Sequence, residues 1–381
     1  MMMSFLPKLV AALGLAAVCG AALAAEAGSL TASYPALERV YRNMAEGGNL
    51  RVAFLGGSIT WGACASDPLK TSYRALVSAH MEQQFPNAHL RFIDAAIGGM
   101  PSKLAVFRMD RDVLPYKPDL VFVEYAVNDF EAADTQETME GIVRKLHNSC
   151  PNAAVVIVII GSNYEYHTPA QAAHTELAKY YGLPVVDICA AVQERIKKGL
   201  DTHSILFDGC HPNDRGYRLY TDVIVDRLTA LQASHGPASP YPDKPLTQNR
   251  YETASIIELS KLPDLGGWRS DSPSVVGTWF DQQPSRWQSS AIAPTKDGAA
   301  LEFDLECRAL GLYYETTKEG GTLLLEADSD KVIDVSTDMD MPLARVGFTV
   351  KMLETSAPWH IRLSAPRCGK GTKVAYLFYT R

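Results

Sequence analysis

Two largely apolar runs restrict the folds open to this chain: DLVFVEYA at residues 119–126 and AAVVIVII at residues 153–160. Both runs are too short to cross a membrane, and neither alternates polar with apolar residues as a half-exposed strand does. As strands they must therefore be buried on both faces. Strands of this kind belong to parallel sheets that helices cover on both sides. The two runs predict the centre of a parallel α/β sheet.

The same pattern continues on both sides of these runs, as far as about residue 235. Short apolar segments alternate with amphipathic stretches of helical length, which predicts a doubly wound α/β domain. The expected strands are Val52–Leu55, Leu90–Ile93, Leu120–Tyr125, Ala154–Ile160 and Pro184–Ile188. The expected helices include Tyr73–Gln84, Lys103–Leu114, Gln136–Asn148 and Pro169–Tyr181.

A proline-rich segment, GPASPYPDKPLTQ from residue 236, interrupts this pattern. It has four prolines and almost no apolar periodicity, as a linker does. Beyond it the period becomes two: in LEFDLEC (301–307) apolar and acidic residues alternate, as in a half-buried antiparallel strand. We therefore expect an α/β domain over residues 25–235, a linker over 236–249 and an all-β sandwich, jelly-roll-like, over 250–381.

The first 24 residues have the features of an export signal. Lys8 provides the positive start, Leu9–Val18 is apolar, and Ala22–Ala24 forms a small-residue cleavage site. We expect cleavage after Ala24 and a mature protein in the periplasm or outside the cell. No later segment is long and apolar enough to span a bilayer, so stable membrane insertion is not expected. The net charge of −7 argues against nucleic acid as a partner, because nucleic-acid binders usually carry a basic surface.

Ser58 occupies the turn that follows the first expected strand, within GGSITWG (56–62). In α/β sheets, that edge is where ligands bind. A serine there is a nucleophile, part of a phosphate-binding loop, or a helix N-cap. A phosphate loop requires a lysine and a second glycine at fixed spacing, which this stretch lacks. The GxSxG pattern of the α/β-hydrolase nucleophile elbow is also missing, so the nucleophile and the cap stay open.

Residues suited to serve a serine nucleophile follow the other expected strands. Gly98 and Gly99 follow the second strand, Asn128 follows the third, and Asp208 and His211 lie in FDGCHPND (207–214) after the fifth. Parallel strands end on one side of a sheet, so all of these residues are expected at the edge that holds Ser58. A histidine can take the serine proton, and N–H groups can stabilise an oxyanion. Each residue alone is compatible with a cap or a turn, but the ordered set favours catalysis.

In this order the residues resemble the sequence blocks of the SGNH/GDSL hydrolase superfamily of serine esterases, over roughly residues 51–231. GGSIT stands where the commoner proteins of that superfamily have a GDSL-type string. The resemblance implies a flavodoxin-like three-layer α/β/α sheet. It also implies hydrolysis of carboxylic esters without a metal or another cofactor.

The resemblance assigns a role to each matching residue. Ser58 (block I) is the nucleophile, His211 the general base and Asp208 the carboxylate that orients it, both in the terminal DxxH block. The oxyanion hole consists of the backbone N–H groups of Ser58 and Gly99 (block II) and the side-chain amide of Asn128 (block III).

The substrate is less constrained by the sequence. We expect a short acyl group, acetyl above all, on a carbohydrate or glycoside, because no amphipathic lid-like segment is present to shelter a long acyl chain. A lipase-like or lysophospholipase-like esterase, a sugar O-acyltransferase, and a non-catalytic glycan-binding envelope protein stay open, as does the oligomeric state. Trp61 lines the substrate pocket or packs in the core. His167 and His174 have no third metal ligand nearby and are expected at the solvated surface.

Six cysteines remain after the expected cleavage, and an oxidising compartment permits disulfides. Cys64 and Cys210 lie on the two loops that carry the candidate nucleophile and base. We therefore expect these two cysteines to be close enough to bond, and Cys307 and Cys368 to tie the β domain in the same way.

Overall fold

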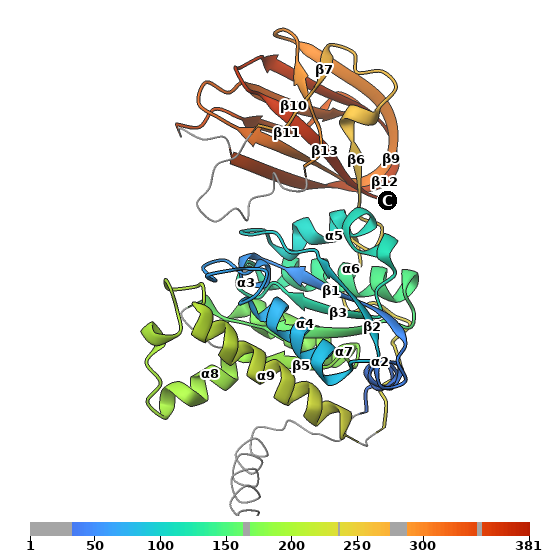
Figure 1. Cartoon of the computed structure of the whole chain (residues 1–381). Helices are drawn as coiled ribbons and strands as arrows, with labels where there is room; N and C mark the ends of the chain where they lie inside the picture. Colours follow the sequence, from blue (N-terminus) through green and yellow to red (C-terminus); the bar gives the residue numbers. More distant parts are fainter. Residues whose placement is uncertain (1–32, 163–167, 235–236, 275–287, 341–344) are drawn as a thin grey trace, which may run out of the picture.

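The computed structural model of the chain describes residues 33–162, 168–234, 237–274, 288–340 and 345–381 (Figure 1). The predicted export signal and His167 lie outside these residues. In the described part of the chain, no helix is long and apolar enough to cross a membrane.

The first domain is built on a parallel sheet of five strands. They are β1 (Asn49–Gly56), β2 (His89–Asp94), β3 (Leu120–Glu124), β4 (Ala154–Ile159) and β5 (Val185–Asp187), in the order β2-β1-β3-β4-β5. Every neighbouring pair is parallel. This is the flavodoxin-like order, in which the switch point lies between β1 and β3. The predicted parallel α/β sheet is confirmed.

Helices cover both faces of this sheet. On one face lie α2 (Pro35–Ala45), α3 (Ser58–Trp61), α4 (Tyr73–Gln84), α8 (Ile188–Lys197) and α9 (Asp214–Gln232). On the other lie α5 (Ser102–Asp112), α6 (Ala132–Ser149) and α7 (Pro169–Tyr180). The 3₁₀ turns η1 (Leu114–Tyr116) and η3 (Thr202–Ser204) lie in the connections.

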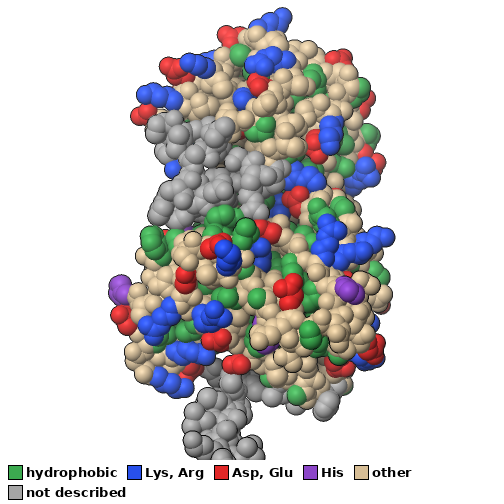
Figure 2. All heavy atoms as spheres, in the orientation of Figure 1, with side chains coloured by type: hydrophobic (Ala, Val, Ile, Leu, Met, Phe, Trp, Pro, Cys, Tyr) green, Lys and Arg blue, Asp and Glu red, His purple; other side chains and the backbone are tan. Residues whose placement is uncertain are grey.

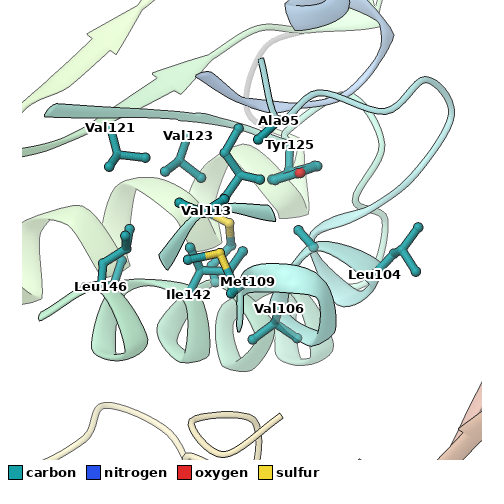
Figure 3. Close-up of a cluster of buried hydrophobic side chains, with 14 of the residues drawn as sticks. Ala95, Leu104, Val106, Met109, Val113, Val121, Val123, Tyr125, Ile142 and Leu146 are labelled. Atoms are coloured by element: carbon teal, nitrogen blue, oxygen red, sulfur yellow. The ribbon is translucent and has the colours of Figure 1, made fainter. Parts of the chain in front are cut away.

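Alternate residues of the central strands supply two separate cores. Val52 and Phe54 of β1 belong to the core beneath α4 and α9, whereas Ala53 and Leu55 belong to the core beneath α5 and α6. Figure 3 shows the second core, where Val121 and Val123 of β3 lie above side chains of α5 and α6 such as Met109, Ile142 and Leu146. The lack of polar alternation in the apolar runs thus reflects burial on both sides.

The second domain is one antiparallel sheet. Its strands are β6 (Ser255–Glu258), β7 (Trp268–Asp271), β8 (Ala291–Pro294), β9 (Ala299–Thr316), β10 (Thr322–Ala327), β11 (Asp330–Ser336), β12 (Arg345–Arg367) and β13 (Lys373–Thr380), and η4 (Leu259–Lys261) follows β6. The order is β11-β10-β12-β9-β13-β8-β7, with β6 on β13. The N–H of Gly267, just before β7, donates to the carbonyl of Ala300 in β9 at 2.8 Å, so the sheet curls back on itself. The expected sandwich is therefore formed by a single bent sheet.

The two domains share a core. Tyr313, Tyr376 and Phe378 of the β domain belong to the same buried cluster as the residues of α5 and α6. The ring of Phe378 stacks on that of Phe107 in α5 with centroids 4.9 Å apart, and the Arg111 guanidinium lies 4.9 Å from the centre of the Tyr376 ring. Figure 1 shows α5 and α6 between the parallel sheet and the β domain.

The segment predicted as a linker also lies against the first domain. The Glu140 carboxylate of α6 accepts hydrogen bonds from the backbone N–H groups of Leu246 and Thr247, the latter at 2.8 Å. The ring of Tyr241 stacks on that of His147 with centroids 3.5 Å apart. This connection is thus fixed to α6 over part of its length.

The expected bridge between Cys307 and Cys368 is wrong, because both cysteines are free thiols. Cys307 is buried in the middle of β9, opposite Ala357 of β12. Cys368 follows the last residue of β12, near the place where that strand pairs with Ala299 at the start of β9. Its N–H donates to Asp297 at 2.6 Å. Along β9, Ala299 is eight residues from Cys307, and eight residues of an extended strand span about 26 Å. A disulfide requires Cα atoms within about 7 Å.

Candidate active site

Ser58 lies where the end of β1 turns into the short helix α3. It is the first residue of that helix, and its side chain is buried, with the residue only 5% exposed. The preceding residue, Gly57, faces the side chain of Asn128 from the loop after β3. A Cβ atom at position 57 would lie 2.1 Å from the Asn128 Oδ1 atom. Glycine at this position therefore lets the Asn128 amide approach the turn that carries Ser58.

His211 bridges Ser58 and Asp208. Its Nε2 atom lies 2.9 Å from the Ser58 Oγ atom, and its Nδ1 atom lies 2.9 Å from Asp208 Oδ2. The other oxygen of Asp208 accepts the backbone N–H groups of Cys210 and His211, both at 2.7 Å. Burial opposes ionisation of Asp208, but these hydrogen bonds outweigh it, so the pKa of the carboxyl lies below its ordinary value. The ionised carboxylate holds the proton of the ring on Nδ1 and leaves Nε2 to accept.

The loop that carries Asp208 and His211 is held in place at both ends. The N–H of Phe207 donates to the carbonyl of His211 at 2.8 Å, which closes the turn. The following helix, α9, is capped by the Asn213 side chain, which accepts the N–H of Gly216 at 3.1 Å. Its first residue, Asp214, accepts the N–H of Ser66 at 2.8 Å and so ties this loop to the loop after α3.

The remaining predicted residues lie on the loops after β2 and β3. Gly99 is exposed and adopts a left-handed φ of +71°, with no atom within 4 Å of a Cβ placed there. Its loop is tied to the end of β1, because the N–H of Ile97 donates to the carbonyl of Gly56 at 3.0 Å. Asn128 is half-buried against Gly57. The structure therefore brings the Asn128 side chain to the Ser58 turn and leaves Gly99 at the open edge of the same loops.

Asp129 and His174 form a buried pair, and Asp129 connects the loops after β2 and β3. Asp129 Oδ1 accepts the N–H of Ser102 at the start of α5 at 2.8 Å, and Asp129 Oδ2 lies 3.0 Å from His174 Nε2. His174 is completely buried on α7, so the expectation of a solvated histidine is wrong. A lone histidine on a helix carries no signal of its partner, because that partner is 45 residues away in the sequence.

Cys64 and Cys210 both lie near the histidine, and both are free thiols, so the structure contains no bridge between them. The Cys64 sulfur lies within 4.8 Å of a carboxylate oxygen of Asp208 and a ring nitrogen of His211. The Cys210 thiol instead has a hydrogen bond with the side chain of Ser162. Burial, followed by the nearby charge of Asp208, raises the pKa of Cys64 to about 12, so this thiol is protonated at neutral pH.

Trp61 and three exposed apolar residues surround this edge. Trp61 is half-buried at the end of α3. Leu69, Phe130 and Phe207 are 76%, 80% and 59% exposed. These three side chains lie on the loops after α3, after β3 and before α9, which also carry or adjoin Ser58, Asn128 and Asp208. The rim of the site is therefore partly apolar.

Comparison with known proteins shows one family match and similar solved structures. Residues 54–219 match the model of the GDSL-like Lipase/Acylhydrolase family. No curated protein matches the chain. A solved two-domain esterase active on acetylated mannans is similar to it, with a TM-score of 0.76 and 24% sequence identity over 93% of this chain and 96% of that one. A second structure of such an esterase, co-crystallised with mannopentaose, gives a TM-score of 0.78 and 24% identity over 92% and 95% of the two chains.

The similarity to these structures covers both domains and shows a common two-domain fold. The family match is independent of it and covers the part of the chain that holds β1 to β5 and the loops described above. Because the matched residues are those that form the parallel sheet and its carboxyl edge, the α/β domain of this chain resembles the GDSL-like Lipase/Acylhydrolase family, and this resemblance supports a hydrolase of carboxylic esters.

Proposed function

We propose that this protein is an exported esterase that removes acetyl groups from a carbohydrate through an acyl-enzyme on Ser58. The observation that carries the catalytic part is the unbroken chain of contacts from Asp208 through His211 to Ser58, with both ring nitrogens at 2.9 Å from their oxygen partners. A serine hydroxyl needs such a base, because it is too weak an acid to lose its proton unaided at neutral pH.

In the proposed first step, Ser58 Oγ attacks the ester carbonyl carbon while its proton moves to His211 Nε2. Asp208, ionised and hydrogen-bonded to Nδ1, stabilises the resulting imidazolium. The tetrahedral oxyanion accepts hydrogen bonds from the N–H groups of Ser58 and Gly99 and from the Asn128 amide. Each donor of this kind contributes on the order of 10²–10³ to the rate.

The intermediate then collapses with release of the sugar hydroxyl, which takes the proton back from His211. A water molecule enters, gives a proton to the same ring nitrogen and attacks the acetyl group on Ser58. Release of acetate and return of the proton to Ser58 complete the cycle. All of the groups required are side chains and backbone N–H groups of the α/β domain.

Two observations support a carbohydrate as the alcohol part of the substrate. The esterase with the same two-domain arrangement is active on acetylated mannans. In addition, Lys, Arg, Asp and Glu side chains are interspersed over the face that Figure 2 shows, with no continuous basic area among the residues described there. Such a surface suits an uncharged polymer better than an anionic one.

The lipase-like alternative is favoured by one feature, the exposed apolar rim formed by Leu69, Phe130 and Phe207. An apolar rim can lie against the face of a sugar ring or against an acyl chain. The length of the acyl chain therefore separates the two functions. Export itself is proposed from the first 24 residues.

The test combines a nucleophile variant with a series of acyl esters. Ser58→Ala should lower kcat for a chromogenic acetyl ester by about 10⁴-fold or more, while Ser78→Ala on α4, away from the site, should not. The wild-type protein should release acetate from acetylated mannan and should lose activity steeply from acetyl to octanoyl esters. Near wild-type turnover by Ser58→Ala would refute the nucleophile. A preference for octanoyl esters would instead establish the lipase-like function.

A further inference from the structure

Three potential metal ligands converge beside the Ser58–His211 pair. Cys64, Asp208 and His211 each offer one ligand atom, and these atoms all lie within 4.8 Å of one another. Cys64 comes from the loop after α3, and the other two come from the loop before α9. The Asp208 and His211 side chains are 39% and 16% exposed, so a small ion can reach them from solvent.

The spacing of these atoms is close to that of a tetrahedral zinc site. With zinc–ligand bonds of about 2.0–2.3 Å, two ligand atoms lie about 3.3–3.8 Å apart. No two of the three atoms are more than 4.8 Å apart, so each separation has to shorten by at most about 1.5 Å for the atoms to surround one ion. The two loops are already joined by the hydrogen bonds from Ser66 and Thr71 to Asp214, both 2.8 Å long, which keep the ligands together.

The chemistry of the donors selects the ion. One sulfur, one imidazole nitrogen and one carboxylate oxygen form a set that suits Zn²⁺, whereas Mg²⁺ and Ca²⁺ prefer oxygen ligands alone. On binding, Zn²⁺ replaces the proton of the Cys64 thiol, and that proton passes to solvent. The thiolate and the Asp208 carboxylate then balance the two positive charges, and water completes the fourth position.

We propose that Cys64, Asp208 and His211 form an inhibitory zinc site that switches the esterase off. Coordination removes the base whichever ring nitrogen binds the ion. If Nε2 binds zinc, its lone pair is no longer available to the Ser58 proton. If Nδ1 binds zinc, the ring proton resides on Nε2, which then donates and cannot accept. In the second case Nδ1 also no longer donates to Asp208, which orients the ring in the zinc-free protein.

A binding experiment tests the site without relying on turnover. Ser58→Ala keeps all three ligands, so in reduced form it should bind one Zn²⁺ per chain in a calorimetric titration. Adding Cys64→Ser to this variant should weaken binding at least 10-fold, whereas adding Cys210→Ser, the neighbouring thiol, should not. Co²⁺ should give a thiolate-to-metal absorption band that Cys64→Ser abolishes. A further variant, His360→Ala, controls for zinc held by the exposed His360–Asp304 pair of the β domain.

An inhibition experiment tests the consequence. Zn²⁺ should inhibit the wild-type enzyme, a chelator should restore activity, and Mg²⁺ and Ca²⁺ should have no effect. Relative to its own zinc-free rate, Cys64→Ser should need at least 10-fold more Zn²⁺ for half-inhibition, and Cys210→Ser the same amount as wild type. Equal zinc affinity with and without Cys64, or the absence of a one-to-one site, would overturn the proposal. Because binding is measured on the inactive Ser58→Ala protein, that result does not depend on the proposed esterase mechanism.

Discussion

Glu124 ends strand β3 with its carboxyl group enclosed beneath the turn that carries Ser58. The residue is 1% exposed, and Thr60 of α3 donates to its Oε2 atom at 2.9 Å. The Thr60 hydroxyl in turn contacts the Tyr73 hydroxyl of α4 at 2.7 Å. Burial raises the pKa of Glu124 to about 7, against the opposing effect of hydrogen bonds from Thr60 and the N–H of Gly57. The group is therefore partly protonated at neutral pH.

The raised pKa of Glu124 predicts a pH-dependent stability. The folded-state pKa of about 7 lies above the ordinary value of 4.5, so the contribution of Glu124 is complete below 4.5 and is lost as the pH rises through 7. Glu124→Gln removes this loss. From pH 5 to pH 8, the free energy of unfolding of the variant should rise relative to wild type by about 1–3 kcal/mol.

Urea unfolding of both proteins at the two pH values measures this difference. The matched control is Glu82→Gln, an exposed glutamate on α4, which should show no such change with pH. A constant difference between Glu124→Gln and wild type across this range would mean that Glu124 is ionised throughout.

At the scale of elements, one buried carboxylate holds together the loops that follow β2 and β3. Asp129 joins the start of α5, through the N–H of Ser102, to α7, through His174. Asn128 immediately precedes Asp129, and Gly99 lies three residues before Ser102. Asn128 and Gly99, the two candidate oxyanion donors on these loops, therefore lie close in sequence to Asp129 itself and to its partner Ser102. His174 is a positioning residue in this arrangement, because it acts through Asp129.

His174→Ala should destabilise the protein and slow catalysis together. Removal of the imidazole leaves Asp129 Oδ2 buried without its partner, which costs about 1–3 kcal/mol of unfolding free energy. The loops should then lose their fixed geometry, so that kcat falls more than KM rises. His174→Gln, which keeps a donor, should recover part of both. Unfolding curves and acetyl ester kinetics measure the effects, with His203→Ala, 94% exposed, as the control. A loss of stability with unchanged kcat would assign His174 a structural role alone.

The strands and helices of the α/β domain could be predicted from the sequence because each depends on the spacing of apolar residues within a short segment. The predicted helix Tyr73–Gln84 coincides with α4, and the five predicted strands overlap β1 to β5 with ends that differ by at most three residues. The positions of Ser58, Asn128, Asp208 and His211 followed from the rule that parallel strands end at one edge. His174 and the cysteines could not be predicted in this way, since their surroundings depend on side chains distant in sequence. For Cys307 and Cys368, the error arose because strand register was unknown.

At the scale of the whole molecule, the two domains are joined by a common buried core. The second domain was expected to be an accessory module joined by a linker, and the alternation of residues 301–307 indicated its strands but not the surface on which it packs. In the structure, Tyr376 and Phe378 cover α5, and the core beneath α5 and α6 extends into the β domain. Loss of the β domain would expose this apolar surface to water.

Phe378→Ala should therefore destabilise both domains at once. Deletion of a buried aromatic ring costs about 3–5 kcal/mol, and the stacked partner Phe107 belongs to the other domain. Tryptophan fluorescence, to which the Trp268 and Trp359 of the β domain contribute, and esterase activity, which depends on the α/β domain, should be lost in one coincident transition on heating. The exposed Met339 provides the control through Met339→Ala. Two separate transitions would show that the domains unfold independently.

The shared core also has a consequence for how the chain is made. Helices α5 and α6 are complete by residue 149, but β13, whose Phe378 ring stacks on Phe107 of α5, is synthesised roughly 230 residues later. At about 5–20 residues per second, the part of α5 that β13 covers stays exposed on the ribosome for about 10–50 s. The nascent first domain must be protected from association during that interval. A message that ends a few codons early, before Tyr376 and Phe378, would leave a nearly full-length polypeptide in which the part of α5 beneath these two rings is bare.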